Sequence, residues 1–241
     1  MQNKIITELL SMASKEKSLV LQRFFKTGKG EYGEGDVFYG ITVPNIRKCV
    51  KKFYSEICFA DLQYFLHSKY HEFRLFGLLV LIEKYEKEKI FEDKQKIIDF
   101  YINNLDYVNN WDLVDLTCYK LLGKFLYDFN LNRQLLYEFA ISKNMWKRRI
   151  AIVSTMYFVK KNDFADTLKI AKILIGDKEG LLQKAVGWLL REVGKKDINI
   201  LKNFMLENIK SLQNITFNYA TEKFTKGEKE YFKSLKNSSN Y

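Results

Sequence analysis

The stretch Lys184-Ala185-Val186-Gly187-Trp188 aligns without a gap on three earlier stretches of the chain. Each stretch has a small or apolar residue at its fourth position, and this position recurs at roughly 37 residues, a spacing typical of proteins built from repeated helix pairs. The alignment therefore predicts a helical-repeat solenoid. The three earlier stretches are Arg74-Leu75-Phe76-Gly77-Leu78, Trp111-Asp112-Leu113-Val114-Asp115 and Arg148-Arg149-Ile150-Ala151-Ile152.

The same alignment gathers reactive side chains on one predicted surface. On a helix, the first and fifth positions of each stretch are i,i+4 neighbours, and the second and fifth are i,i+3 neighbours. Stacked repeats would then carry Trp111, Asp115, Arg149 and Trp188 along one concave wall. A carboxylate, an arginine and two tryptophans on one wall form the candidate site.

Composition and periodicity favour helix throughout. The 241 residues are 47% hydrophobic, with one Pro and 12 Gly, so few residues break helices. No segment alternates with period two, which excludes a sheet. We expect an all-α fold, a HEAT-like helical-repeat solenoid (an α-α superhelix) with a concave basic groove, formed as a single domain over 1–241. The helices are expected near 44–54, 59–68, 71–87, 91–104, 110–127, 131–141, 144–160, 162–174, 179–194 and 197–209, with more from about 215.

The N-terminal part, 1–38, is expected to hold two amphipathic helices followed by a glycine-rich loop at 28–35. This loop lacks the GxxxxGK[ST] order of a phosphate-binding loop, which argues against a nucleotide site. Thr42 suits the cap of the next helix, and Pro44 suits its first turn. The polar tail, 236–241, is expected to fray.

The formal charge of +11 makes nucleic acid or an anionic surface the leading class of partner. A lysine-rich, solvated surface is the alternative. The distribution favours the first, because Arg74, Arg148, Arg149 and Lys184 fall on or beside the concave register. A positive groove about as wide as a duplex would bind DNA through its backbone. No recognition-helix or zinc-finger pattern is present, so no reading of base sequence is expected.

Several classes of protein are excluded. Three Cys without ligand spacing and two His make a zinc site improbable and offer no disulfide framework. No secretory signal opens the chain, and the longest apolar run, 75–82, is too short to span a bilayer. We therefore expect a cytoplasmic monomer that needs neither metal nor cofactor and binds no membrane.

The segment 109–115 holds two carboxylates with different expected roles. Asn110 suits an N-cap, and Asp112 lies in the first turn, where the helix dipole favours a negative charge. That reason is sufficient for Asp112, so it is not assigned to catalysis. Asp115 lies beyond the first turn on the same face as Trp111. Asp115 could instead be an ordinary solvated helix residue, but its alignment with Arg149 and Trp188 disfavours this alternative.

The segment 183–192 places a glycine in mid-helix directly before Trp188. Glycine there costs about 1 kcal/mol relative to alanine. Close helix packing, or room for a ligand beside the indole, would compensate for this cost. Trp146 is expected in the core or at a helix cap.

Four segments in order resemble the AlkD-like family of alkylpurine DNA glycosylases, which are built of HEAT-like repeats. The resemblance runs from about Tyr39 to Lys195. It implies excision of cationic N3- or N7-alkylated purines from duplex DNA in base excision repair, with backbone contacts and no snug base pocket. The segments are 39–47 (Tyr-Gly-Ile-Thr-Val-Pro-Asn-Ile-Arg), 111–115, 146–151 and 183–192.

Carried over residue by residue, Trp111 and Trp188 match the two cleft tryptophans of the family. Asp115 matches the catalytic carboxylate, and Arg149 matches the arginine near the phosphate. Arg148, Lys184, Arg74 and Arg47 are the further candidates for DNA contacts. The family commonly has a second aromatic residue before the first cleft tryptophan, and Asn110 stands there instead.

Two other functions fit the same features less well. A non-catalytic HEAT-repeat binder of damaged or branched DNA would need only the positive groove. A protein-interaction scaffold would show no salt-dependent affinity for DNA, and the charge argues against it.

Overall fold

The computed structural model describes residues 1–238, and every regular element among them is a helix. One isolated parallel bridge joins Val37 to Tyr70, and no strand forms in these residues. The predicted all-α fold is confirmed. The chain divides into two compact units, Met1–Thr117 and Cys118–Tyr241. Each is described by itself, and the single domain over 1–241 stays a prediction.

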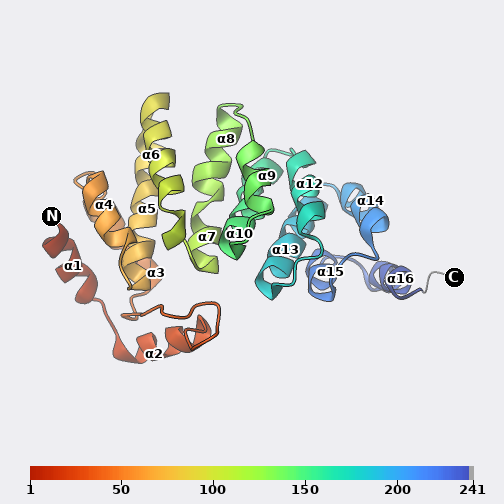
Figure 1. Cartoon of the computed structure of the whole chain (residues 1–241), viewed down its shortest axis with the longest axis horizontal. Coiled ribbons are helices and arrows are strands. Elements are labelled where there is room, and N and C mark those ends of the chain that lie inside the picture. Colours follow the sequence, from red (N-terminus) through yellow and green to blue (C-terminus); the bar gives the residue numbers. More distant parts are fainter. Residues whose placement is uncertain (239–241) are drawn as a thin grey trace. The chain divides into compact units, whose positions relative to one another are not determined.

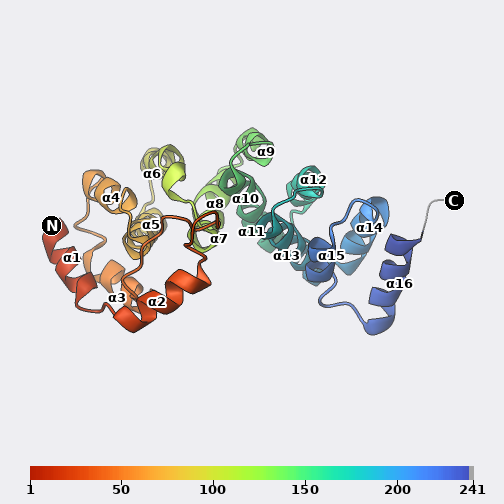
Figure 2. The same cartoon turned by 60° about the horizontal axis from the view of Figure 1, so that its bottom comes forward.

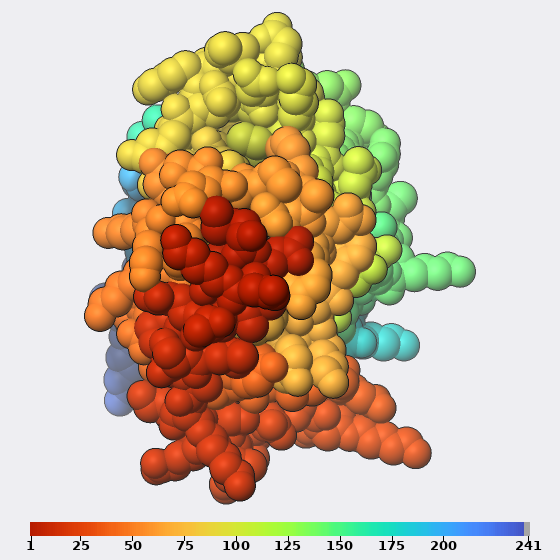
Figure 3. All heavy atoms as spheres, turned by 90° about the vertical axis from the view of Figure 1, so that its left-hand side faces the viewer, coloured from red at the N-terminus to blue at the C-terminus, as the bar shows by residue number. Residues whose placement is uncertain are grey.

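The first unit is built around helix α5, which is buried along most of its length and packs against α3, α4, α6 and α7. Figure 1 shows these helices as neighbours, coloured from orange through yellow to light green. In Figure 3, α1 covers α3 and α4 at the N-terminal end. The elements are α1 (Gln2–Leu10), α2 (Lys15–Phe24), α3 (Val43–Phe53), α4 (Phe59–Leu66), α5 (His71–Lys87), α6 (Phe91–Asn103), the 3-10 turn η1 (Leu105–Tyr107) and α7 (Trp111–Thr117).

Helix α2 differs from the other helices of this unit because none of its residues is buried. Figure 1 shows it below α3, outside the helix pairs, and in the turned view of Figure 2 it lies beside α3. The segment that follows returns to α5, where the Glu72 carboxylate accepts the backbone N–H groups of Tyr39, Gly40 and Ile41 at 3.0, 2.7 and 3.1 Å. Gly40 has φ +78°, and a Cβ there would lie 2.1 Å from the carbonyl oxygen of Ser14. Only glycine therefore lets this connection pass so close to α2.

The second unit is a succession of helices in which α13 packs most extensively on α15. Its elements are the π-helical turn η2 (Tyr119–Gly123), α8 (Lys124–Asp128), α9 (Gln134–Ala140), α10 (Met145–Ser154), α11 (Met156–Lys160), α12 (Ala165–Leu174), α13 (Gly180–Lys196), α14 (Ile198–Asn208), α15 (Asn214–Ala220) and α16 (Lys226–Asn237).

The glycine before Trp188 is explained by this packing. A Cβ on Gly187 would lie 2.5 Å from Cβ of Tyr219 and 2.7 Å from the carbonyl oxygen of Thr216. Close approach of α15 to α13, rather than room for a ligand, is therefore the reason for glycine at this position.

Two long predicted helices are interrupted. The helix expected over 110–127 contains the π-turn η2, whose last residue, Gly123, lies so close to Ser154 that a Cβ would be 2.1 Å from its carbonyl oxygen. The helix expected over 144–160 is broken at Thr155. At the C-terminus, α16 extends through Asn237, and Lys236 donates to the carbonyl of Leu212 at 2.6 Å. The rest of the tail predicted to fray, residues 239–241, lies outside the described residues.

None of the helices within residues 1–238 combines the length and the apolar composition needed to cross a bilayer.

Candidate functional site

The start of α7 carries the main elements of the candidate site in the first unit. Asn110 caps the helix, since its side-chain oxygen accepts the backbone N–H of Trp111 at 2.8 Å. Its amide nitrogen donates to Asp36 at 3.0 Å, and the side chain is fully buried. The predicted cap is therefore present, and the second bond ties it to the glycine-rich segment.

An aromatic stack fixes the indole of Trp111. The ring of Phe25 lies 5.4 Å from the indole at an interplanar angle of 17°, and Phe24 meets its edge at 6.0 Å. Phe25 stacks in turn on Phe38 at 5.0 Å, and Phe38 stacks on the imidazole of His71 at 4.6 Å. The residues at the end of α2 thus orient Trp111.

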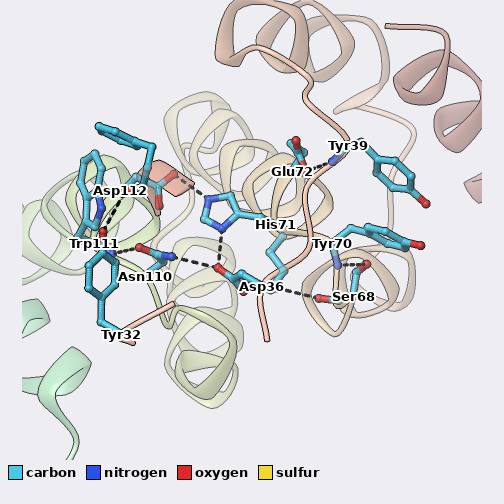
Figure 4. Close-up of polar contacts among 12 residues, drawn as sticks. Tyr32, Asp36, Tyr39, Ser68, Tyr70, His71, Glu72, Asn110, Trp111 and Asp112 are labelled. Carbon is cyan, nitrogen blue, oxygen red and sulfur yellow. Dashed lines mark hydrogen bonds and ion pairs between the residues drawn. The ribbon is translucent and has the colours of Figure 1, made fainter. Parts of the chain in front are cut away.

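His71 lies between two carboxylates in the interior of this unit (Figure 4). Its Nδ1 is 3.0 Å from Asp36 and its Nε2 is 2.8 Å from Asp112, and the side chain is only 2% exposed. Burial alone would lower the pKa of His71, but the two carboxylates outweigh burial and raise the pKa to about 9. His71 is therefore a buried imidazolium at neutral pH.

Asp36 collects several donors. Burial would raise the pKa of Asp36, but the hydrogen bond from His71 and the charge of Arg74 outweigh burial and lower that pKa. The guanidinium of Arg74 donates to Asp36 and, at 3.1 Å, to the carbonyl of Ser68. Arg74 is 4% exposed. This residue, a candidate for DNA contact, is an interior residue of the first unit.

The two carboxylates of α7 lie in different surroundings. Asp112 is 8% exposed and bound to His71. Asp115 is half-buried, as is Trp111, one helical turn before it. The structure therefore places Asp112 in the interior and brings Trp111 and Asp115 together on one helix, as the i,i+4 spacing requires.

The remaining candidates divide between exposed and interior positions. Arg47 on α3 and Lys184 on α13 are exposed. Arg148 binds Asp177 through Nε at 2.6 Å and the carbonyls of Ser142 and Lys143 at 2.9 and 3.0 Å. The last two candidates are Arg149 of α10, which is 5% exposed and donates to the carbonyl of Leu181, and Trp188 of α13, which is half-buried.

The fourth positions of the four aligned stretches are alike in burial, but the fifth positions are not. All four fourth positions are buried. The fifth positions differ, because Leu78 and Ile152 are fully buried while Asp115 and Trp188 are half-buried. Arg149 and Trp188 belong to the second unit, and a wall that they share with Trp111 and Asp115 stays a prediction.

A family profile described as "DNA alkylation repair enzyme" matches residues 5–224. The chain belongs to this family. Two solved structures share its fold. A predicted DNA alkylation repair enzyme from Enterococcus faecalis is 17% identical with a TM-score of 0.71, and the match covers 89% of this chain and 98% of that one. AlkD2 from Streptococcus mutans is 16% identical with a TM-score of 0.56, covering 88% and 99%. No curated protein matches the chain.

Within the DNA alkylation repair enzyme family, this chain has a site that its sequence revealed only in part. The repeat alignment selected Trp111 and Asp115 but not Phe24, Phe25, Asp36 or His71. The pair Phe24-Phe25 before the glycine-rich loop is the sequence feature that could have signalled the stack. His71 was considered only as a metal ligand. No group of His, Cys, Asp and Glu side chains suited to a metal ion occurs within residues 1–238.

Proposed function

We propose that this member of the family is a monofunctional DNA glycosylase that hydrolyses the N-glycosidic bond of cationic N3- or N7-alkylated purines in duplex DNA. The observation that carries the proposal is the pair on α7, a half-buried carboxylate one turn after a half-buried indole, in a chain whose family is named for DNA alkylation repair. DNA alkylation repair is also the description of a structural neighbour.

The chemistry needs few groups from the protein. A purine alkylated at N3 or N7 carries a positive charge and leaves readily, so no general acid is required. Cleavage builds positive charge on the deoxyribose, which an ionised Asp115 would stabilise electrostatically. The same carboxylate can orient the attacking water. The face of Trp111 would add a cation–π attraction of about 0.5–2 kcal/mol.

Burial divides the proposed DNA contacts into two groups. Arg47 and Lys184 are exposed and suited to direct phosphate contact, where each contact releases counterions. Arg148 is 17% exposed, but its guanidinium already binds Asp177 and the carbonyls of Ser142 and Lys143, so we assign it to positioning. Arg74 and Arg149 are interior, and we assign them to positioning: Arg74 holds Asp36, and Arg149 holds the first turn of α13.

The experiment is a base-release assay on methylated duplex DNA under single-turnover conditions. We expect the protein to release 7-methylguanine or 3-methyladenine, and Asp115→Asn to slow release about 100- to 1,000-fold while leaving DNA affinity within a few-fold. Asp106→Asn, the same substitution at an exposed residue of η1 in the same unit, is the matched control and should release base at the wild-type rate.

Two outcomes would overturn the proposal. An unchanged rate in Asp115→Asn would remove the role assigned to this carboxylate. Salt-dependent DNA binding without release of any methylated base would instead support the non-catalytic DNA binder.

A further inference from the structure

A cavity of about 400 Å³ lies beneath α2 in the first unit. Helix α2 forms one wall with Val20 and Leu21, and α3 forms another with Pro44 and Ile46. The rings of Phe25 and Phe38 contribute apolar surface, and the deep polar wall comes from His71, Glu72 and Asp112. Small-molecule sites are roughly 300–1,000 Å³ and mostly apolar with a few polar groups, so the cavity has the size and lining of a ligand site.

The wall formed by α2 is held weakly. Val20 lines the cavity and is still 58% exposed, and α2 buries none of its residues. The hydroxyl of Ser18 donates to the carbonyl of Phe38 at 2.7 Å, and the backbone N–H of Ser14 donates to that of Tyr39 at 2.9 Å. The middle of α2 can move to admit a ligand with the loss of few apolar contacts, whereas its end is held by the rings of Phe24 and Phe25 against Trp111.

One carboxylate oxygen in this wall lacks a partner. Asp112 is 8% exposed, and its Oδ2 accepts from His71, but no group in residues 1–238 donates to its buried Oδ1. A buried acceptor without a donor costs about 1–3 kcal/mol. A bound N–H group would remove this cost.

The other polar groups of the wall are already occupied. Both ring nitrogens of His71 face carboxylates, and both oxygens of Glu72 accept backbone N–H groups. Of the side-chain N and O atoms of His71, Glu72 and Asp112, Oδ1 of Asp112 is the one without a partner within residues 1–238, and because it is closed to solvent, a ligand must displace part of the wall to reach it. Glu16 and Lys17 also line the cavity, at the outer end of α2. Their charges are opposite, so together they favour neither a cationic nor an anionic ligand.

We propose that this cavity binds a small organic cation with an apolar body and one primary ammonium group, which donates to Oδ1 of Asp112. The apolar body fills the space between α2 and α3. The positive charge of the ammonium group pairs with the carboxylate of Asp112, beside His71. Neither Trp111 nor Asp115 lines the cavity, although Phe25, which lines it, also stacks on Trp111.

The test uses 4-phenylbutylamine as the probe and 4-phenylbutanol as its neutral control, titrated calorimetrically into the full chain. We expect saturable binding of the amine and at least tenfold weaker binding of the alcohol. Asp112→Asn should weaken the amine at least tenfold and leave the alcohol unchanged. Equal affinities for amine and alcohol, or an unchanged amine affinity in Asp112→Asn, would overturn the role of the carboxylate.

A second pair of variants locates the site and does not depend on the folding of the Asp112 variant. Val20→Trp places an indole in the cavity from an exposed position and should abolish amine binding. Leu19→Trp, on the same helix at a residue that is exposed and does not line the cavity, should bind the amine like wild type. Absence of saturable binding to wild type, or equal binding by both tryptophan variants, would refute the site. Base release is measured separately, so failure here leaves the proposed function standing.

Discussion

Helices α5 and α10 begin with the same arginine arrangement, one in each unit. Arg74 donates to the carbonyl of Ser68 at 3.1 Å, and Arg148 donates to that of Ser142 at 2.9 Å, each six residues back along the chain. Each guanidinium also pairs with a carboxylate from a distant loop, which is Asp36 for Arg74 and Asp177 for Arg148.

The two arrangements differ in what surrounds the arginine. In the second unit, the helix starts at Met145, and the side chain of Arg148 is 17% exposed. In the first unit, the aligned residue is His71, a buried imidazolium between Asp36 and Asp112. The arginine is therefore a structural element of the repeat, whereas the histidine is an addition that ties the glycine-rich segment to the start of α7.

Replacing His71 should have the largest effect on stability. His71→Met gives α5 the residue that α10 has, but it leaves Asp112 buried without a partner, and breaking a buried pair costs about 3–5 kcal/mol. Urea denaturation followed by circular dichroism would measure the loss. The reciprocal change, Met145→His, should cost under about 1 kcal/mol because Met145 is only half-buried. Equal losses in the two variants would contradict the distinction between the units.

Replacing the arginine should also cost more stability in the first unit than in the second. Arg74→Met leaves Asp36 and the Ser68 carbonyl in the interior, so we expect a loss of about 3–5 kcal/mol. Arg148→Met should cost about 1–2 kcal/mol, because Arg148 is 17% exposed against 4% for Arg74, so its removal opens Asp177 to solvent more readily. The same denaturation experiment measures both, and a larger loss for Arg148→Met would reverse our ranking.

The charge of His71 predicts a pH dependence. Its pKa rises from 6.5 in the unfolded chain to about 9 in the folded protein. The resulting stability, about 3 kcal/mol at about 1.4 kcal/mol per pKa unit, is fully present below pH 6.5 and is lost as pH rises through 9. Unfolding free energies measured from pH 6 to 10 should show this decline in wild type. If the free energy of unfolding of His71→Met fell by the same amount over this pH range, groups other than His71 would be responsible.

Two glycines, both at the fourth position of aligned stretches, should differ by a smaller amount in how alanine changes stability. Gly187→Ala would place a Cβ 2.5 Å from Cβ of Tyr219 and 2.7 Å from a backbone oxygen, which should cost about 1–3 kcal/mol. Gly77→Ala meets side-chain atoms and no backbone, with Leu66 Cδ2 at 3.2 Å, Leu66 Cγ at 3.3 Å and Phe65 Cβ at 3.4 Å, and alanine favours helix by about 1 kcal/mol. We expect Gly77→Ala to be neutral or stabilising in thermal unfolding, and similar losses at both positions would show that α13 and α15 are not unusually close.

The sequence predicted the helices well where local signals agree. Helix α5 has the predicted bounds, 71–87, and Asn110 caps α7 as its side chain suggested. The π-turn at Tyr119–Gly123 was not predicted; its last residue, Gly123, lies close against Ser154, and nothing in the local sequence signals that contact.

The candidate site was predicted where its residues belong to one repeat. Trp111 and Asp115 share α7, so helical spacing is enough to bring them together. The cluster of Asp36, His71 and Asn110 joins residues up to 74 positions apart and depends on a loop whose path no periodicity describes. The burial of Arg74 and Arg149 was missed for the same reason, since their partners lie on distant segments.

The two carboxylates of α7 provide the most direct test of the central claim, that Asp115 acts on DNA while its neighbour Asp112 maintains the fold. The measurement is the single-turnover rate of base release from methylated duplex DNA, compared with the free energy of unfolding, for Asp112→Asn and Asp115→Asn. We predict that Asp115→Asn slows release about 100- to 1,000-fold with a change in stability below about 1 kcal/mol. Asp112→Asn should lose about 1–3 kcal/mol of stability and release base within a few-fold of the wild-type rate. A rate that falls in Asp112→Asn and persists in Asp115→Asn would contradict the account.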